Sequence, residues 1–318
     1  MKRSAAALTA VVAFIAGVFM ASPAQASTPR LSVASHNVMF LSQVLFPNWA
    51  QGARADLIAE ADFMRGHDII AVQEAFAVKA GSRLRDNLAG EYPHMTPVVG
   101  RSTSGWDDTG GSFRWTKPEN GGVFLASKWP ITRQEQHVFE RGCGIDALAN
   151  KGIAYAELDV DGSTVHAVSA HLQSEDPGCD LDAGEDASVR ASQLQEIRSF
   201  LDAKAIPEDE QVVIAGDLNI TRGSEEHLKM LAALGADDPT WEGGQYSFDP
   251  VANSVARDRY EGDRRETLDY VLLLADHAGP ADWTNTVLDR RSPEWSVTSW
   301  GKTYTYDDYS DHYPVIGG

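Results

Sequence analysis

The stretch QVVIAGDLN, residues 211–219, is the segment from which the fold of this chain is most easily inferred. Its first half, QVVIA, is short and apolar, which is typical of a strand that is buried on both faces. Gly216-Asp217-Leu218-Asn219 follows, so a carboxylate and an amide stand at the end of the strand. Because Gly, Asp and Asn all favour turns, this tetrapeptide alone fits a simple turn as well as a functional site.

Other apolar runs of the chain have polar side chains at their ends in the same way. They are 31–36 followed by Asn37, 68–72 followed by Gln73-Glu74, 164–170 followed by His171, 267–274 containing Asp269, and 313–316 preceded by Asp311-His312. Alternation or β-branched composition favours strands at these places. The sequence therefore places acids, amides and histidines at strand ends.

Helical periodicity between these strands sets the fold class. Helices are predicted at 53–64, at 79–88, at 187–203, and from a cap at Ser224 to Gly235. Asp161-Gly162 between two apolar runs predicts a β-hairpin. Hairpins mixed with helices predict an α/β protein of two packed, mixed, largely antiparallel sheets flanked by helices. With no internal linker rich in Pro, Gly or Ser, residues 27–318 are expected to form a single domain.

The polar residues at the strand ends form one candidate site, which comprises Asn37, Glu74, His171, Asp217, Asn219, Asp269, Asp311 and His312. Taken one at a time, each is more often a solvated, capping or structural side chain. Oxygen ligands without cysteine suit a hard cation such as Mg²⁺. The chain has neither a Gly-x-Ser-x-Gly elbow nor a His-Glu-x-x-His zinc helix, so the joint order of these residues is the specific signal.

That order resembles the fold family of pancreatic deoxyribonuclease, which includes metal-dependent endonucleases, inositol polyphosphate phosphatases and sphingomyelinases. The elements that carry the resemblance are Asn37, Gln73-Glu74, His171, Gly216-Asp217-Leu218-Asn219, Leu268-Asp269-Tyr270 and Ser310-Asp311-His312. They follow the family's order over nearly the whole chain. The resemblance implies a DNase I-like four-layer α/β sandwich with its active site at one rim of the two sheets.

Three features are most similar to the secreted bacterial neutral sphingomyelinase C group of that family. They are residues 118–130, the cysteines Cys143 and Cys179, and residues 292–315. The resemblance implies a monomeric, Mg²⁺-dependent phosphodiesterase that contacts membranes peripherally and hydrolyses sphingomyelin to ceramide and phosphocholine. It also implies a disulfide between the two cysteines, whereas the residues alone leave two free thiols as the alternative.

The same resemblance assigns a metal site. Glu74 is expected to be the main protein ligand of Mg²⁺, for which Mn²⁺ or Co²⁺ could substitute, with Asn37 and Asp311 in the same set. Relatives carry a second, edge metal site, but here its amide ligand is replaced by Val78 and its Glu-Asp pair by Glu119-Asn120. An edge metal at Glu119 is therefore expected to bind weakly, if at all.

The catalytic roles follow from the resemblance and from ordinary side-chain chemistry. His312 is expected to act as general base, because its usual pKa suits neutral pH, and Asp269 is expected to orient it. Asp217 and Asn219 would position the nucleophile and the phosphoryl oxygens. His171 would either donate to a phosphoryl oxygen or protonate the leaving group. In this group of proteins the position of Asp146 also lies near the site.

The segment before His312 is expected to be a hairpin that touches membranes. Trp300 sits at its presumed tip, where indole suits a lipid interface, and Lys302 could meet a lipid phosphate. Relatives often carry two bulky apolar residues at the tip, so the affinity of this hairpin for membranes is expected to be lower. Core packing is expected instead for Trp295 and Tyr313.

The N-terminus has the features of a secretory signal peptide. Lys2 and Arg3 precede an apolar run at 5–21, and Ala24-Gln25-Ala26 resembles a cleavage site. Residues 1–26 are therefore expected to be removed from an extracellular protein. An uncleaved membrane anchor is the alternative.

The charge of the chain narrows the choice of substrate. Asp and Glu total 46 against 27 Lys and Arg, which gives a formal net charge of −19. Affinity for nucleic acid comes largely from basic side chains that replace counterions, so no nucleic-acid partner is expected. A secreted metal-dependent nuclease, or another phosphodiesterase or phosphatase of the same fold, remains the alternative. No sequence feature points to a protein partner.

Overall fold

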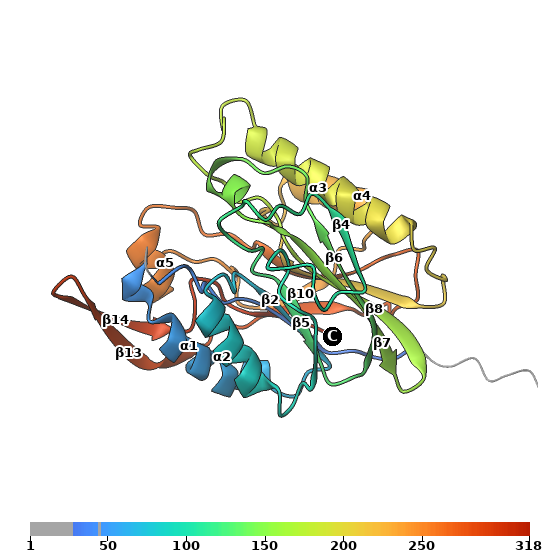
Figure 1. The fold of residues 1–318 in the computed structure, drawn as a ribbon, viewed down its shortest axis with the longest axis horizontal. Coiled ribbons are helices and arrows are strands. Elements are labelled where there is room, and N and C mark those ends of the chain that lie inside the picture. Colours follow the sequence, from blue (N-terminus) through green and yellow to red (C-terminus); the bar gives the residue numbers. More distant parts are fainter. Residues whose placement is uncertain (1–27, 44–45) are drawn as a thin grey trace, which may run out of the picture.

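The computed structural model describes residues 28–43 and 46–318, and two sheets carry helices on their outer faces (Figure 1). The predicted signal peptide lies outside the described residues. The first sheet has seven strands in the order β10-β12-β15-β1-β2-β5-β3, with bounds Thr240–Gly243, Thr284–Val287, Val315–Gly317, Val33–Asn37, Ile69–Gln73, Phe124–Ser127 and His94–Met95.

The second sheet has six strands, and a separate two-stranded hairpin stands apart from both sheets. The strands of the second sheet follow the order β11-β9-β8-β7-β6-β4, with bounds Asp269–Leu273, Gln211–Asp217, Ser163–His171, Gly152–Val160, Ile131–Val138 and Asp108–Gly111. Both sheets are mixed, because β1–β2 and β8–β9 are parallel while most other pairs are antiparallel.

Helices cover the outer face of each sheet. These helices are Gln51–Glu60 (α1), Val78–Leu88 (α2), Glu185–Asp202 (α3) and Glu225–Leu234 (α4). The short helix Ser254–Arg259 (α5) packs against the separate hairpin instead, and 3-10 turns lie at Pro47–Trp49, Asp62–Met64 and Gly144–Leu148. In Figure 1, α1 and α2 lie below the sheets and α3 and α4 lie above them. The predicted cap is confirmed, since Ser224 Oγ accepts from the N–H of His227 and Gly235 ends α4 at φ 67°.

Alternating side chains hold the layers together. Val33 and Ile69 face the core between the sheets, whereas their neighbours Ala34 and Ile70 face α1 and α2. The second sheet does the same, with residues such as Val213 packing inward and others packing against α3 and α4. Helix, sheet, sheet and helix make four layers, so the predicted α/β sandwich is confirmed.

The hairpin of β13 (Arg291–Ser299) and β14 (Lys302–Asp308) projects at the left of Figure 1. Trp300 and Gly301 form its turn at φ 52° and 74°, and the Trp300 side chain is 94% exposed. At the base, Trp295 packs on Tyr306 with ring centroids 4.5 Å apart. The core positions predicted for Trp295 and Tyr313 are confirmed, because both side chains are buried.

No helix within the described ranges is both long enough and apolar enough to cross a membrane.

Candidate active site

Strand register brings the predicted site residues together. In the second sheet Asp217 lies opposite His171 on β8 and opposite Asp269 on β11. In the first sheet Asn37 lies opposite Gln73, so Glu74 begins just past the same edge. The two edges meet, because Asn37 Nδ2 donates to Asp217 Oδ2 at 2.9 Å.

Unusual backbone conformations shape this edge. A Cβ on Gly216 would lie 2.0 Å from the carbonyl oxygen of Ala170, so only glycine lets β9 approach β8 here. Glu74 and Asn219 adopt left-handed φ values of 58° and 52°. Asparagine tolerates that region, whereas for glutamate it costs about 1 kcal/mol or more. The fold therefore accepts local strain to direct Glu74 toward the cleft.

His312 and Asp269 form a buried pair. His312 Nδ1 lies 2.8 Å from Asp269 Oδ2, and the other ring nitrogen, Nε2, lies 3.8 Å from Asp217 Oδ2. Burial opposes a charge on His312, but the carboxylates of Asp269 and Asp217 outweigh it and hold the pKa of His312 well above its ordinary value. The two carboxylates thus favour the protonated form of this histidine.

The carboxylates beside this pair are crowded. Burial, followed by the charge of Asp311, raises the pKa of Glu74 to about 7. Burial also raises the pKa of Asp217 to about 6, with the Asp269 carboxylate adding to the effect against His312. Buried acids that repel one another in this way would be stabilised by a cation.

The donor set fits such a cation. Ligand atoms of Glu74, His171 and Asp217 all lie within 4.8 Å of one another. Asp311 is buried beside them, where its Oδ1 accepts from the hydroxyl of Ser310. Asn37 completes the set from the first sheet, and its Oδ1 accepts from the N–H of Met39. Carboxylate oxygens dominate, which suits Mg²⁺.

Two other predicted residues line the same site. The backbone N–H of Asn219 donates to Asp217 Oδ1 at 3.0 Å, and its Nδ2 donates to the carbonyl of Leu172. Glu119 reaches the cleft from a loop, where its Oε1 accepts from Asn120 Nδ2 at 2.8 Å. Val78 lies at the start of α2 and is exposed.

Lys151 is a site residue that sequence reasoning missed. It is buried, and its Nζ lies 2.7 Å from Asp146 Oδ2 and 3.2 Å from His171 Nε2. Burial and then the Lys151 charge hold the pKa of His171 well below its ordinary value, so the neutral ring can accept from the ammonium at Nε2. A lysine at the start of a strand has no motif that would distinguish it, and Asp146 was placed near the site only by resemblance.

Arg54 was also missed, although it ties two parts of the site together. Its buried guanidinium donates to the carbonyls of Val38 and Met39, just after Asn37, and to that of Tyr309, just before Asp311. On α1 it lies four residues before Ile58, on the apolar face of the helix, and this spacing is the one sequence signal that could have revealed its burial. We infer that it positions both segments.

A cleft of about 850 Å³ opens over these residues. Glu74, His171, Asp217, Asp311 and His312 form its polar floor. Its walls carry Leu41, Phe46, Phe76, Pro118, Ile145, Leu148, Leu181, Phe248 and Tyr260. Trp300 and Lys302 are outside the cleft lining and lie at the hairpin turn.

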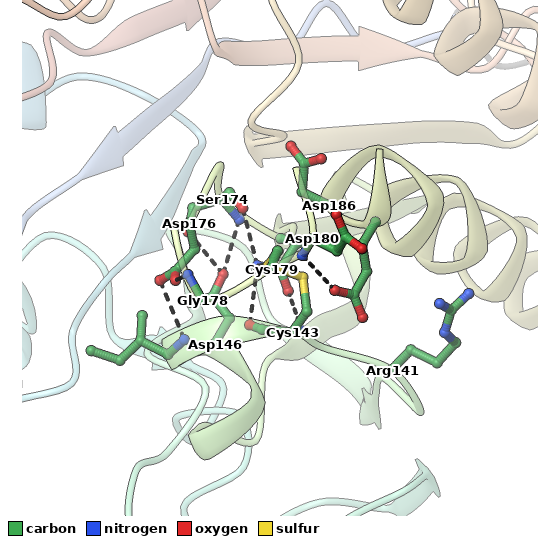
Figure 2. Close-up of a disulfide and its surroundings, with 12 residues drawn as sticks. Arg141, Cys143, Asp146, Ser174, Asp176, Gly178, Cys179, Asp180 and Asp186 are labelled. Atoms are coloured by element: carbon green, nitrogen blue, oxygen red, sulfur yellow. Dashed lines mark hydrogen bonds between the residues drawn. A yellow bond between two sulfur atoms is a disulfide. The ribbon is translucent and has the colours of Figure 1, made fainter. Parts of the chain in front are cut away.

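The predicted disulfide is confirmed, because Cys143 and Cys179 are joined across 36 residues (Figure 2). Around it, the Asp146 carboxylate accepts from the N–H of Ser174 at 2.9 Å. Asp146 thus connects the disulfide region to Lys151 and, through it, to His171.

This fold and this cluster of acids and histidines define a class of phosphoesterases. The Endonuclease/Exonuclease/phosphatase family profile matches residues 34–312, and the chain belongs to that family.

Within the family, the chain is similar in sequence and structure to bacterial sphingomyelinase C proteins. It is 44% identical to sphingomyelinase C of Listeria ivanovii over 289 residues, covering 91% of this chain and 86% of that protein. The crystal structure of sphingomyelinase C from Streptomyces griseocarneus is 51% identical, with a TM-score of 0.89 and coverage of 92% and 99%. A beta toxin variant of Staphylococcus aureus with bound magnesium ions is 43% identical, with a TM-score of 0.89 and coverage of 90% and 98%. The resemblance inferred from the sequence is confirmed.

Proposed function

We propose that this chain is a Mg²⁺-dependent phosphodiesterase that hydrolyses sphingomyelin to ceramide and phosphocholine. The observation that carries the proposal is the buried His312–Asp269 pair, which faces the carboxylates of Glu74 and Asp217 in one cleft. Relatives named sphingomyelinase C share the whole extent of the fold and more than two fifths of its residues.

Glu74 and Asp311, with Asn37 beside them, would hold the metal. A bound Mg²⁺ would offset the negative charge of the phosphodiester, which otherwise repels an attacking water. The raised pKa of Glu74 supports this assignment, since this carboxylate is costly to ionise without a nearby cation. At the edge, Val78 offers no ligand atom and Glu119 already accepts from Asn120, so we expect no strong second metal there.

His312 acts as the base at its Nε2 atom. Asp269 fixes the Nδ1–H tautomer and stabilises the imidazolium that forms. A cation bound near Asp217 would offset part of the negative charge that raises the pKa of His312, and would so favour the neutral ring that can accept a proton from water. Asp217, held by Asn37 and Asn219, then orients that water and the phosphoryl oxygens.

The leaving oxygen departs on the side of His171 and Lys151. The Lys151 ammonium, 3.2 Å from His171 Nε2, would supply the proton, which His171 takes up at Nε2 and passes to the departing alkoxide. Asp146 keeps the ammonium in place. We infer that His171 combines the two roles considered for it, contacting a phosphoryl oxygen and passing a proton to the leaving group.

The hairpin and the N-terminus complete the proposal. We propose that Trp300 and Lys302 contact lipid at the hairpin turn, where the indole has no protein core to enter. We also propose that residues 1–26 direct secretion and are cleaved, leaving one monomeric domain at 27–318.

One assay of the purified protein tests the function. Sphingomyelin, phosphatidylcholine, ceramide phosphoethanolamine and duplex DNA are offered separately, each with Mg²⁺ and with EDTA. We expect Mg²⁺-dependent release of phosphocholine from sphingomyelin as the fastest reaction. A preference for DNA, or full turnover in EDTA, would contradict the proposal.

A further inference from the structure

Three exposed aliphatic side chains stand at the mouth of the cleft. Ile145, Leu148 and Leu181 are 60%, 53% and 39% exposed, and all three line the cleft. They belong to residues 144–148 and 174–181, which we call the disulfide flap. Large apolar side chains that gather at an opening indicate an interaction surface more strongly than scattered ones.

The disulfide flap is held so that these side chains stay outside. The Cys143–Cys179 bond joins its two segments, and Asp176 Oδ2 accepts from the N–H of Ile145 at 3.2 Å (Figure 2). The 3-10 turn at 144–148 contains no buried residue. The side chains are thus presented to solvent by a cross-linked backbone.

We propose that the disulfide flap is a lipid-docking surface, separate from the hairpin, that rests on a bilayer of zwitterionic choline lipids. The inference rests on the proposed function for one point only, which is that the substrate phosphodiester lies at a bilayer surface. The two hydrocarbon chains of the ceramide part of such a substrate stay in the bilayer, so the mouth of the cleft must approach hydrocarbon. Ile145, Leu148 and Leu181 supply the apolar rim that this approach requires.

The charge around the rim selects the kind of lipid surface. Four acids flank the aliphatic side chains: Glu175, Asp180 and Asp182 are exposed, and Asp176 is half-buried. Only Glu175 has a basic partner among the ion pairs of the described residues, namely Arg264 at 3.5 Å. Acids at the rim repel anionic headgroups and attract the trimethylammonium group that lies outermost on choline lipids.

The flap and the hairpin face the bilayer from two points. In Figure 1 the β13–β14 hairpin projects at the left, and the start of α3, which follows the flap, lies near the top of the molecule. A single contact at Trp300 would leave the molecule free to tilt about its tip. Contact at the flap as well would fix the tilt and bring the cleft floor to the headgroup layer.

The test uses the full chain with Ile145, Leu148 and Leu181 changed together to serine. Leu228→Ser is the matched control, because Leu228 on α4 is 65% exposed and does not line the cleft. Both changes are placed in a His312→Ala background with Mg²⁺, so that vesicles are bound but not consumed. Co-sedimentation with sphingomyelin–phosphatidylcholine vesicles is then measured, and thermal melts confirm that every variant is folded.

We expect the triple variant to bind these vesicles at least about tenfold more weakly, and the control to stay within about twofold of its parent. Adding phosphatidylserine to the vesicles should weaken binding of the parent. In the active background, the triple variant should lose at least about fivefold more activity on vesicles than on a soluble short-chain phosphocholine ester.

Two results would overturn the inference, namely unchanged vesicle binding by the folded triple variant, or tighter binding of the parent to anionic vesicles. Failure of the proposed function is a different result. If the native chain bound vesicles through the flap but released no phosphocholine, the proposed docking surface would be supported and the proposed activity would be wrong.

Discussion

Glu74 and Asp217 are carboxylates that the folded protein keeps partly protonated, with pKa values of about 7 and about 6. A metal must displace those protons, so its apparent affinity rises with pH through this range. We expect Mg²⁺ binding to be clearly weaker at about pH 5.5 than at about pH 7.5, with net proton release on binding. Calorimetry in two buffers of different ionisation enthalpy measures both.

The ionisation of Glu74 also makes the free energy of unfolding depend on pH in a predictable direction. Because the folded pKa of Glu74 exceeds its ordinary value of 4.5, its contribution to stability is complete below about pH 4.5 and is lost as pH rises through about 7. Mg²⁺ should therefore raise the melting temperature more at neutral than at acid pH. Glu74→Gln is the control, since it keeps the shape but should release fewer protons on metal addition and show a smaller Mg²⁺ shift.

His312 and Asp269 allow a paired prediction on the chemical step. His312→Ala should lower kcat by roughly two to four orders of magnitude, the usual range for a general base. Asp269→Asn should also be impaired, because the amide no longer stabilises the imidazolium and can favour the wrong tautomer. Circular dichroism shows whether each variant is folded. Near-native turnover by folded His312→Ala would rule out this residue as the base.

At the scale of elements, the disulfide flap should be a source of stability. Closing a loop of 36 residues is worth about 3–4 kcal/mol in the chain-entropy model. Cys143→Ser/Cys179→Ser should lose roughly that free energy of unfolding in a denaturant titration, with a smaller effect on turnover of soluble substrate. A mass measurement on the native protein should find two fewer hydrogens than the reduced chain.

The hairpin tip gives a second prediction at this scale. Trp300→Ala should weaken binding to sphingomyelin vesicles and slow their hydrolysis, while a soluble phosphocholine ester is turned over nearly as before. Trp115→Ala is the control, because this indole is also exposed but belongs to the loop between β4 and β5. Equal loss on both substrates would show that Trp300 supports the active site instead.

For the whole molecule, the net charge of −19 predicts behaviour toward polyanions. Repulsion should prevent stable binding of duplex DNA at about 0.15 M salt, even though the family includes nucleases. Gel retardation with catalytically inactive His312→Ala measures this without cleavage. A salt-dependent shift at micromolar protein would indicate a basic groove that overrides the net charge.

The sequence predicted the interior of this fold better than its edges. Buried strands such as β2 and β9 are continuous apolar runs, and α4 carries its own cap and terminal glycine. Short edge strands such as β4 and β10 are polar and exposed, so no periodicity marks them. Their pairing depends on neighbours that only the tertiary structure provides.

Some residues of the candidate site could be predicted from the sequence, and others could not. Acids, amides and histidines at strand ends could be found because together they follow the order of a known family along the chain. Lys151 and Arg54 could not, since their importance lies in burial and in the carbonyls and rings that they meet. Nothing in a single sequence distinguishes a lysine that will be buried from one that will be solvated.

The length by which the β13–β14 hairpin projects sets the distance between Trp300 at its tip and the body of the protein. Each strand residue advances the chain by about 3.3 Å, so two added residues per arm would move Trp300 outward by about 7 Å and keep its facing. One added residue per arm would exchange the two faces instead. With Trp300 anchored in lipid, the longer hairpin would hold the cleft too far from the membrane surface to reach the scissile bond. If Trp300 contacts lipid as proposed, the length of the hairpin sets the height of the cleft above the lipid phosphodiester.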